Sequence, residues 1–244
     1  MKAKDLRNSI LQMAVQGKLV PQDPADEPAS VLVERIRKER AKLIKEKKIK
    51  APRGGESVIF RASDGGHYEK RVDARGREGE PVCIDDEIPF EIPESWAWSR
   101  IGTLFSMQAG KNIAAARISD TQDGDHPYPC FGGNGIRGYV KESNRNGRFP
   151  IVGRQGALCG CVNYAEGGFY ATEHAIVTTC FDKTDVGWAC LVLEALNLNQ
   201  YATATAQPGL AVSKIVDVLI PVPPISEQAR IKEAYNAFQE LTNQ

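Results

Sequence analysis

The apolar residues near the start of the chain repeat with a helical period. Leu6, Ile10, Met13 or Ala14, and Gly17 fall on one stripe. Residues three and four apart share one face of a helix, so this stripe predicts a helix over residues 2–19. Pro21 and Pro24 follow it, and because proline removes a backbone donor the helix should end there.

A second helical pattern covers residues 27–50, with Asp26 as the expected N-cap. Ala29, Ile36 and Leu43 lie seven residues apart, with Leu32 and Val33 beside them. So narrow an apolar seam is typical of a helix that packs on one other helix. Residues 34–50 also contain nine Lys or Arg and three Glu, and a solvated helix face is the simplest explanation of these charges.

Residues 51–82 are rich in glycine and charge and poor in apolar side chains, which predicts a linker or a loose hairpin. The next stretch, residues 81–99, carries five acidic residues and no basic ones. Trp96 and Trp98, followed by Ile101, mark the expected beginning of a globular region.

Short apolar runs then alternate with glycine-rich turns. Runs at 150–152, 158–164, 174–181 and 215–220 predict strands. A helix is expected over residues 185–198, with Asp185 near its cap. Together these patterns predict an α+β fold. A compact mixed α/β domain would occupy residues 83–224, with a long helical stalk formed by residues 1–50 and 225–244.

Three prolines separate the last predicted strand from the last predicted helix. Pro221, Pro223 and Pro224 lack a backbone N–H, so neither a strand nor a helix should pass through them, and we expect a stiff joint. Ser226 is the expected N-cap of the helix that follows. The apolar stripe of that helix is Ile231, Ala234, Tyr235, Phe238 and Leu241.

Composition and charge narrow the function classes only slightly. The 244 residues carry 31 basic and 31 acidic side chains, so the total does not indicate a nucleic-acid binder. Residues 111–154, however, hold seven basic and four acidic residues among Gly and Asn. No apolar run is long enough for a membrane helix or a signal peptide, which predicts a cytoplasmic protein whose six cysteines are reduced.

The stretch most suggestive of an enzyme is "CFGGNGIRGYV", residues 130–140. Phe131, Gly133 and Gly135 fit the F-x-G-x-G turn of many S-adenosylmethionine-dependent DNA methyltransferases. Such a turn should follow a buried strand, whereas a polar, proline-containing segment precedes this one. A hairpin or loop built by residues 132–135 is therefore favoured over a cofactor site.

Several polar residues near glycines are candidate DNA contacts. Arg and Gln pair bidentately with guanine and adenine, which singles out Arg154 and Gln155 between two glycines. Lys111 and Asn112 after Gly110 are typical of phosphate contacts. For both pairs the alternative is a solvated turn or loop.

Two further groups have structural explanations. Glu173 and His174 lack a second carboxylate or a nucleophile at a readable spacing, so a hydrogen-bonded structural pair is favoured over acid–base chemistry. Cys159 and Cys161 are spaced more closely than zinc ligands usually are, so packed thiols are favoured over a zinc site.

Six stretches share one likeness: "LRNSILQMAVQGKLVPQDPADEPASVLVERIRKER", "EIPESWAWSRIGTLF", "YPCFGGNGIRGYV", "IVGRQGALCGCVNY", "ATEHAIVTTC" and "LNQYATATAQPGLAVSKIVDVLIPVPPISEQARI". They resemble the DNA-specificity (S) subunits of type I restriction-modification enzymes. The first stretch resembles the conserved helical region, the next four resemble a target recognition domain, and the last resembles its exit into another conserved helix. The likeness covers nearly the whole chain except residues 51–80.

The resemblance implies a non-catalytic protein that needs no cofactor or metal. A target recognition domain of this family reads one half of a split site in double-stranded DNA. The conserved helices pair as an antiparallel coiled coil and dock two modification subunits, which bind S-adenosylmethionine and methylate adenine. A separate restriction subunit cleaves DNA. An assembly scaffold that no longer reads DNA is a further alternative.

The chain departs from the family pattern because full S subunits have two recognition domains and two helical regions. We therefore expect either a natural half-subunit that dimerises through its helices or a piece of a longer chain, and the apolar stripe that reaches Leu241 favours the second. Recognition domains diverge with their targets, so the resemblance does not fix the DNA contacts. The hypothesised contacts are Lys111, Asn112, Asn134, Arg137, Arg154 and Gln155.

Overall fold

The computed structural model describes residues 3–203 and 208–242, and the chain divides into two compact units. The first unit comprises Met1–Phe105, Phe181–Trp188 and Asp217–Gln244, and the second comprises Ser106–Cys180 and Ala189–Val216. Some predicted segments lie outside the described ranges. They are residue 2 of the first predicted helix, residues 243–244 of the last predicted helix, and residues 204–207 of the stretch that leads into it.

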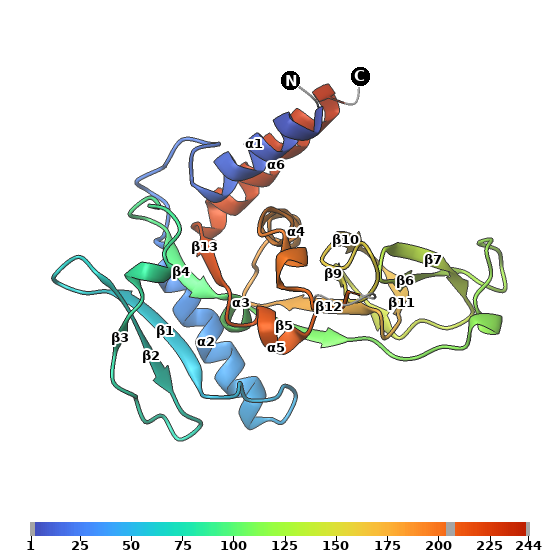
Figure 1. Cartoon of the computed structure of the whole chain (residues 1–244), viewed down its shortest axis with the longest axis horizontal. Coiled ribbons are helices and arrows are strands. Elements are labelled where there is room, and N and C mark those ends of the chain that lie inside the picture. Colours follow the sequence, from blue (N-terminus) through green and yellow to red (C-terminus); the bar gives the residue numbers. More distant parts are fainter. Residues whose placement is uncertain (1–2, 204–207, 243–244) are drawn as a thin grey trace. The chain divides into compact units, whose positions relative to one another are not determined.

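Two helices open the chain, most strands follow in consecutive runs, and a long helix closes it (Figure 1). The helices are α1 (Ala3–Val15), α2 (Ala29–Lys45), α3 (Ile101–Leu104), α4 (Val186–Ala195), α5 (Val212–Ile215) and α6 (Ile225–Thr242), with short 3-10 turns at Asp85–Glu87, Ala115–Arg117 and Leu198–Tyr201. The strands are β1 (Glu56–Arg61), β2 (His67–Val72), β3 (Val82–Cys83), β4 (Ala97–Arg100), β5 (Phe105–Ala109), β6 (Tyr128–Gly132), β7 (Gly135–Val140), β8 (Arg145–Asn146), β9 (Phe149–Gly153), β10 (Val162–Ala165), β11 (Gly168–Ala171), β12 (Ala175–Cys180) and β13 (Leu219–Val222).

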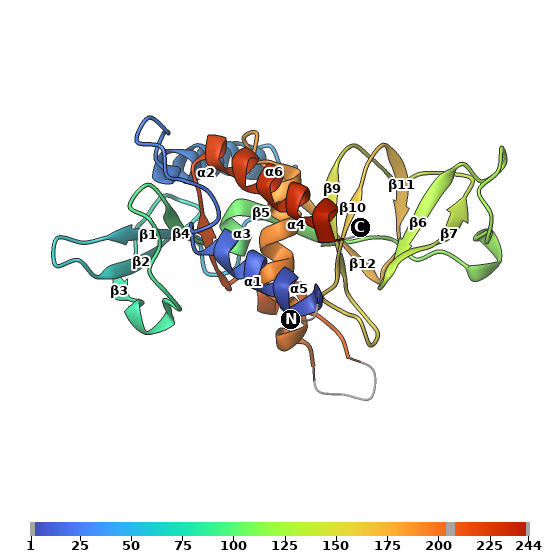
Figure 2. The same cartoon turned by 90° about the horizontal axis from the view of Figure 1, so that it is seen from above.

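In the first unit α1 and α6 lie side by side and antiparallel, so that the start of α1 and the end of α6 lie at the same end of the pair (Figures 1 and 2). The Arg7 side chain donates a hydrogen bond of 3.1 Å to the Tyr235 hydroxyl across the pair. The two helices predicted at the ends of the chain are thus present. Within the predicted stripe of α1 Ala14 is buried, whereas Met13 is exposed.

Helix α2 begins at Ala29, and the prediction that Asp26 caps it is wrong. Pro28 occupies the N-cap position, and the Asp26 carboxylate instead pairs with Arg230 of α6 at 2.5 Å. The sequence also predicted that this helix packs on one other helix. This is wrong, because α2 packs against both the short helix α3 and strand β4.

One basic residue of α2 departs from the expected solvated face. The Arg40 side chain is 5% exposed and pairs with Glu56 at 3.3 Å. Its guanidinium carbon lies 5.4 Å from the centre of the Phe181 ring. A buried guanidinium needs such partners because its desolvation is costly. Arg40 therefore fastens α2 to the sheet that follows it.

Of the linker and the loose hairpin predicted for residues 51–82, the structure has a hairpin, which is part of a three-stranded sheet. Strands β1 and β2 make an antiparallel hairpin in which Phe60 faces Tyr68, and β3 adds to the edge of β2. The Arg100 side chain, 7% exposed, pairs with Glu69 and Glu87, both at 2.7 Å. Burial is the largest single influence on the pKa of Glu69 and would raise it. The hydrogen bonding from Arg100, together with smaller contributions that include the charges of Arg100 and Arg71, lowers this pKa overall.

The three prolines predicted to form one stiff joint are divided between a strand and the connection that follows it. Strand β13 continues through Pro221, which pairs in register with Trp98 of β4. A proline fits this strand because the sheet has only two strands, which leaves one edge of β13 without a ladder. Helix α6 begins at Ile225, so Ser226 lies inside its first turn and donates to Asp26 instead of capping the helix. Only Pro223 and Pro224 separate the two elements.

The second unit contains two four-stranded sheets, with orders β10-β9-β12-β5 and β7-β6-β11-β8. Strands β6 and β11 run parallel, and the other pairs that include β6 or β11 run antiparallel. Three phenylalanines meet in the core: the Phe169 ring lies edge-on to Phe131 at 5.6 Å and to Phe149 at 5.8 Å. Burying each aromatic ring contributes about 1.5–3 kcal/mol, so this cluster is a main source of the unit's stability.

Most predicted elements of this region are present with shifted ends. The strand expected at 158–164 is β10, which begins only at Val162 because residues 157–160 form a turn. The strand expected at 215–220 is β13, and Ile215 instead ends α5. Asp185 caps α4 as predicted: its carboxylate accepts a hydrogen bond of 2.9 Å from the backbone N–H of Trp188.

The predicted α+β class is confirmed by this mixture of sheets and helices. The compact units do not follow the expected segment boundaries, since residues 83–105 and 217–224 belong with the terminal helices. No helix among residues 3–203 and 208–242 is long and apolar enough to cross a membrane.

Candidate functional site

The glycine-rich segment at residues 132–135 forms a tight hairpin turn. Gly132 at the end of β6 pairs with Gly135 at the start of β7, and Gly133 and Asn134 make the two-residue connection. Gly135 has a φ of +85°, a conformation that L side chains rarely adopt. The prediction of a hairpin at this position is confirmed, and the F-x-G-x-G spacing belongs to a β-turn rather than to a strand-to-helix loop.

Glycines hold this turn against the end of β9. A Cβ on Gly133 would lie 2.2 Å from the Gln155 carbonyl oxygen, and a Cβ on Gly153 would lie 2.1 Å from the Gly133 carbonyl oxygen. Gly153 thus lets two parts of this chain approach each other closely. Gly156 differs, because nothing lies within 4 Å of its Cβ position.

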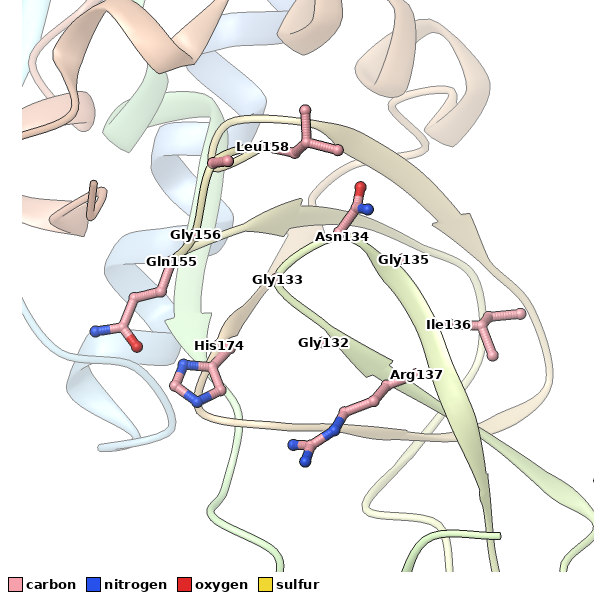
Figure 3. A pocket seen from close by; sticks show the side chains of 11 residues that line it. Gly132, Gly133, Asn134, Gly135, Ile136, Arg137, Gln155, Gly156, Leu158 and His174 are labelled. Carbon is pink, nitrogen blue, oxygen red and sulfur yellow. The ribbon is translucent and has the colours of Figure 1, made fainter. Parts of the chain in front are cut away.

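An open concavity of about 630 Å³ lies beside the hairpin turn, within the second unit. Its lining comes from the hairpin, from the turn after β9 and from the segment before β12: Gly132, Gly133, Asn134, Gly135, Ile136, Arg137, Gln155, Gly156, Ala157, Leu158 and His174. Figure 3 shows Gln155, His174 and Arg137 on the lower side of the view, and Leu158, Asn134 and Ile136 above and to the right. Three of the six hypothesised DNA contacts are therefore brought to one place.

The polar side of the concavity offers both donors and acceptors. Arg137 is exposed and Gln155 is half-buried, so the guanidinium and the amide remain within reach of a ligand. His174 contacts its neighbour, with Nε2 3.3 Å from the Glu173 carboxylate, which supports the predicted structural pair. The His174 ring nevertheless lines the concavity, which sequence reasoning missed.

Two large apolar side chains also line the concavity. Leu158 is 56% exposed and Ile136 is 54% exposed. Sequence reasoning missed both as site residues, and Leu158 falls in a run that was predicted to be a strand. Leu158 is exposed because residues 157–160 form a turn instead of a strand. Gly156, just before this turn, and Gly160, at its end, both adopt positive φ.

Arg154 lies next to the concavity without lining it. Its guanidinium donates a hydrogen bond of 3.1 Å to the Glu173 carbonyl oxygen, and its backbone N–H donates one of 2.8 Å to the His174 carbonyl oxygen. These bonds tie the end of β9 to the segment that positions His174. Since Arg has five N–H donors, one such bond leaves others for a ligand, and the DNA contact of Arg154 stays a prediction.

Lys111 and Asn112 lie elsewhere in the second unit. They follow β5, and the segment is anchored by hydrogen bonds from the Lys111 N–H to the Ala171 carbonyl at 3.0 Å and from the Tyr170 hydroxyl to the Asn112 carbonyl at 3.1 Å. Both side chains are exposed. Their proposed phosphate contacts stay a prediction, as do those of the concavity residues.

Two of the cysteines, Cys130 and Cys159, are buried. Cys161, beside the concavity, donates to the Gly133 carbonyl at 3.4 Å, and burial raises the pKa of its thiol. No group of three or more His, Cys, Asp or Glu side chains is placed to hold a metal within the part of the chain that the structure describes.

Sequence comparison gives two informative relatives, both from Escherichia coli. The EcoprrI specificity subunit, of a type I restriction enzyme, is 48% identical over 143 residues, which are 59% of this chain and 36% of the relative. The EcoAI specificity subunit, also of a type I restriction enzyme, is 42% identical over 105 residues, 43% of this chain and 14% of the relative. The chain thus spans only about a third or less of these relatives.

Structure comparison agrees on the fold. The type I restriction-modification S subunit from M. genitalium matches with a TM-score of 0.52 and 21% identity over 59% of this chain and 39% of that chain. A structure from work on the assembly of a type I restriction-modification system covers 100% of this chain and 54% of that chain, with a TM-score of 0.50 and 15% identity.

The family match covers the residues that build the concavity. The family described as "Type I restriction modification DNA specificity domain" matches residues 93–244, more than half of the chain. The methyltransferase alternative, which rested on residues 131–135, receives no support from these likenesses. The chain belongs to the type I restriction-modification DNA specificity domain family.

Proposed function

We propose that this chain is the non-catalytic, DNA-reading part of a type I restriction-modification enzyme. The observation that carries the proposal is that the family match at residues 93–244 includes the concavity where Arg137, Gln155 and Asn134 gather. Arg and Gln are the side chains best suited to read guanine and adenine edges. The chain would bind double-stranded DNA by sequence and would leave methylation of adenine and cleavage to partner subunits.

The six hypothesised contacts have different proposed roles. Asn134, Arg137 and Gln155 would contact base edges from the concavity, with Arg154 beside them. Lys111 and Asn112, on an exposed segment away from it, would contact phosphates. The antiparallel pair of α1 and α6 would belong to the helical stalk that docks modification subunits, a restriction subunit or a second copy of the chain. A chain with these partners would be cytoplasmic.

Selection of bound duplexes from a random DNA pool, with the full chain alone and with a modification subunit, tests the proposal. We expect one enriched motif. Arg137→Ala should relax selection at one base position, at a cost of about 1–3 kcal/mol in discrimination. Lys111→Ala should weaken binding to all sequences equally and reduce the salt dependence by about one phosphate contact.

Two results would contradict the proposal. A failure to enrich any motif, with normal assembly, would indicate a scaffold that does not read DNA. Micromolar binding of S-adenosylmethionine to the purified chain, measured by titration calorimetry, would indicate a methyltransferase.

A further inference from the structure

The basic residues of α2 and of the loop after it fall into two groups. The arginines of the helix make ion pairs within the first unit: Arg35 with Asp182, Arg37 with Glu34, and Arg40 with Glu56. At the end of α2 and in the loop that leads to β1 (Figure 1), six further basic residues are exposed, and we call them the α2 basic patch: Lys42, Lys45, Lys47, Lys48, Lys50 and Arg53.

The α2 basic patch concentrates charge in a chain whose net charge is zero. Residues 42–53 contain six basic residues and one acidic residue, Glu46, which pairs with Lys48 at 2.8 Å. Glu56, at the start of β1, is held by the buried Arg40 instead. A local excess of this size creates a positive potential that attracts a polyanion.

The backbone at Lys47 gives independent evidence that its side chain is used. Helix α2 ends in a Schellman motif, in which the N–H groups of Lys47 and Lys48 donate to the carbonyls of Ile44 and Leu43, both at 2.9 Å. Lys47 takes the left-handed position of this motif, with a φ of +58°, where glycine is usual because it has no Cβ to strain. A lysine at this position costs stability, and such strain is concentrated at functional sites.

We propose that the α2 basic patch contacts the phosphate backbone of duplex DNA without regard to sequence. The inference rests on the DNA binding of the proposed function and adds a second DNA surface, since the patch lies outside residues 93–244 that the family match covers. A lysine ammonium is a compact charge on a flexible stem, which suits phosphates, whereas base reading depends on the fixed geometry of Arg, Asn and Gln side chains.

The salt dependence of binding to a duplex without the selected motif tests this proposal. Each phosphate contact contributes about 0.9 to the slope of log K against log salt concentration. In the full chain, Lys45→Gln combined with Lys50→Gln should reduce the slope by about 2. Lys18→Gln combined with Lys183→Gln removes two exposed lysines of the same unit outside the patch, and this matched control should keep the wild-type slope.

Lys47→Gly separates the use of the side chain from its effect on the fold. Glycine relieves the backbone strain, so the urea midpoint should rise while the salt slope falls by about 0.9. Lys183→Gly is the matched control, because Lys183 is also exposed and has a φ of +60°. It should raise the urea midpoint and keep the wild-type slope.

The outcomes separate this inference from the proposed function. Wild-type slopes in both patch variants, or an equal fall in the slopes of the controls, would show that the patch makes no phosphate contacts of its own. If the slopes fall as expected but no motif is enriched from random duplexes, the second DNA surface stands and the proposed reading of sequence fails. Loss of assembly with a modification subunit at an unchanged slope would assign the patch to a protein partner and overturn the inference.

Discussion

At the scale of single residues, several polar side chains are used differently from what their positions along the chain suggested. Asp26 stands where an N-cap is common, yet it pairs with Arg230 about two hundred residues away. Glu227, in the first turn of α6, is fully buried and accepts hydrogen bonds from Gln22 at 2.6 Å and Trp96 at 2.9 Å. These contacts join distant segments, so no local pattern reveals them.

Glu227 makes stability depend on pH. Burial raises its pKa, and the hydrogen bonds from Trp96 and Gln22 do not fully offset this. A carboxyl whose pKa is raised by folding stabilises the fold below its unfolded pKa of about 4.3, and this contribution is lost as pH rises through the folded value. We therefore expect wild type to gain stability relative to Glu227→Gln as pH falls from 7 to 4.

Urea unfolding of both proteins at pH 7, 5.5 and 4 measures this difference. Glu233→Gln, which changes an exposed carboxylate on the same helix, controls for the loss of one charge. The prediction would be contradicted if the difference in free energy of unfolding between wild type and Glu227→Gln stayed constant with pH.

At the scale of elements, the hairpin turn and the end of β9 are fitted to each other through glycine. A Cβ on Gly133 would lie 2.2 Å from the carbonyl oxygen of Gln155, a backbone atom that cannot move aside freely. This close contact holds the backbone of Gln155 against the hairpin turn. The shape of the concavity therefore depends on Gly133, and on Gly153, whose Cβ would lie 2.1 Å from the Gly133 carbonyl oxygen.

Gly133→Ala is expected to lower the free energy of unfolding by about 1–3 kcal/mol, as overpacking of a close contact does. Gly124→Ala is the matched control, since nothing lies within 4 Å of its Cβ position, and it should stay within about 0.5 kcal/mol of wild type. Urea denaturation checks both variants, and equal stability of the two would show that the turn can shift without cost.

At the scale of the whole molecule, the first unit is assembled from three separated parts of the chain. Helix α2 supplies Leu32 and Ile36, which are fully buried, and burying each contributes about 1.5–3 kcal/mol. Removal of residues 1–50 should therefore destabilise this unit severely. The second unit keeps its own core around Phe169 and should remain folded.

All three tryptophans lie in the first unit, so their fluorescence reports on that unit. In the truncated chain we expect the urea midpoint of fluorescence to fall or the transition to disappear. Hydrogen exchange in β9 and β12 should remain slow. In the full chain, Leu32→Ala should cost about 2–5 kcal/mol, and Val31→Ala, at an exposed position, should be nearly neutral. A truncated chain with wild-type fluorescence unfolding would contradict the assembly of the first unit from these parts.

The sequence by itself determined the helices at both ends, the α+β class, the cap at Asp185 and the glycine hairpin at residues 132–135. These features depend on periodicity, on capping and on turn chemistry, which act between neighbours in the chain. The sequence also determined the family resemblance, because its likeness to type I specificity subunits extends over long runs of residues.

Only the tertiary structure decided which of these residues meet. It carried β13 through Pro221, since a two-stranded sheet leaves one edge free for a residue without an N–H. It exposed Leu158 by placing it in a turn between two positive-φ glycines, and it brought Gln155, Arg137 and His174 into one concavity. Such contacts join residues far apart in the chain, and their free energy depends on packing that no local pattern specifies.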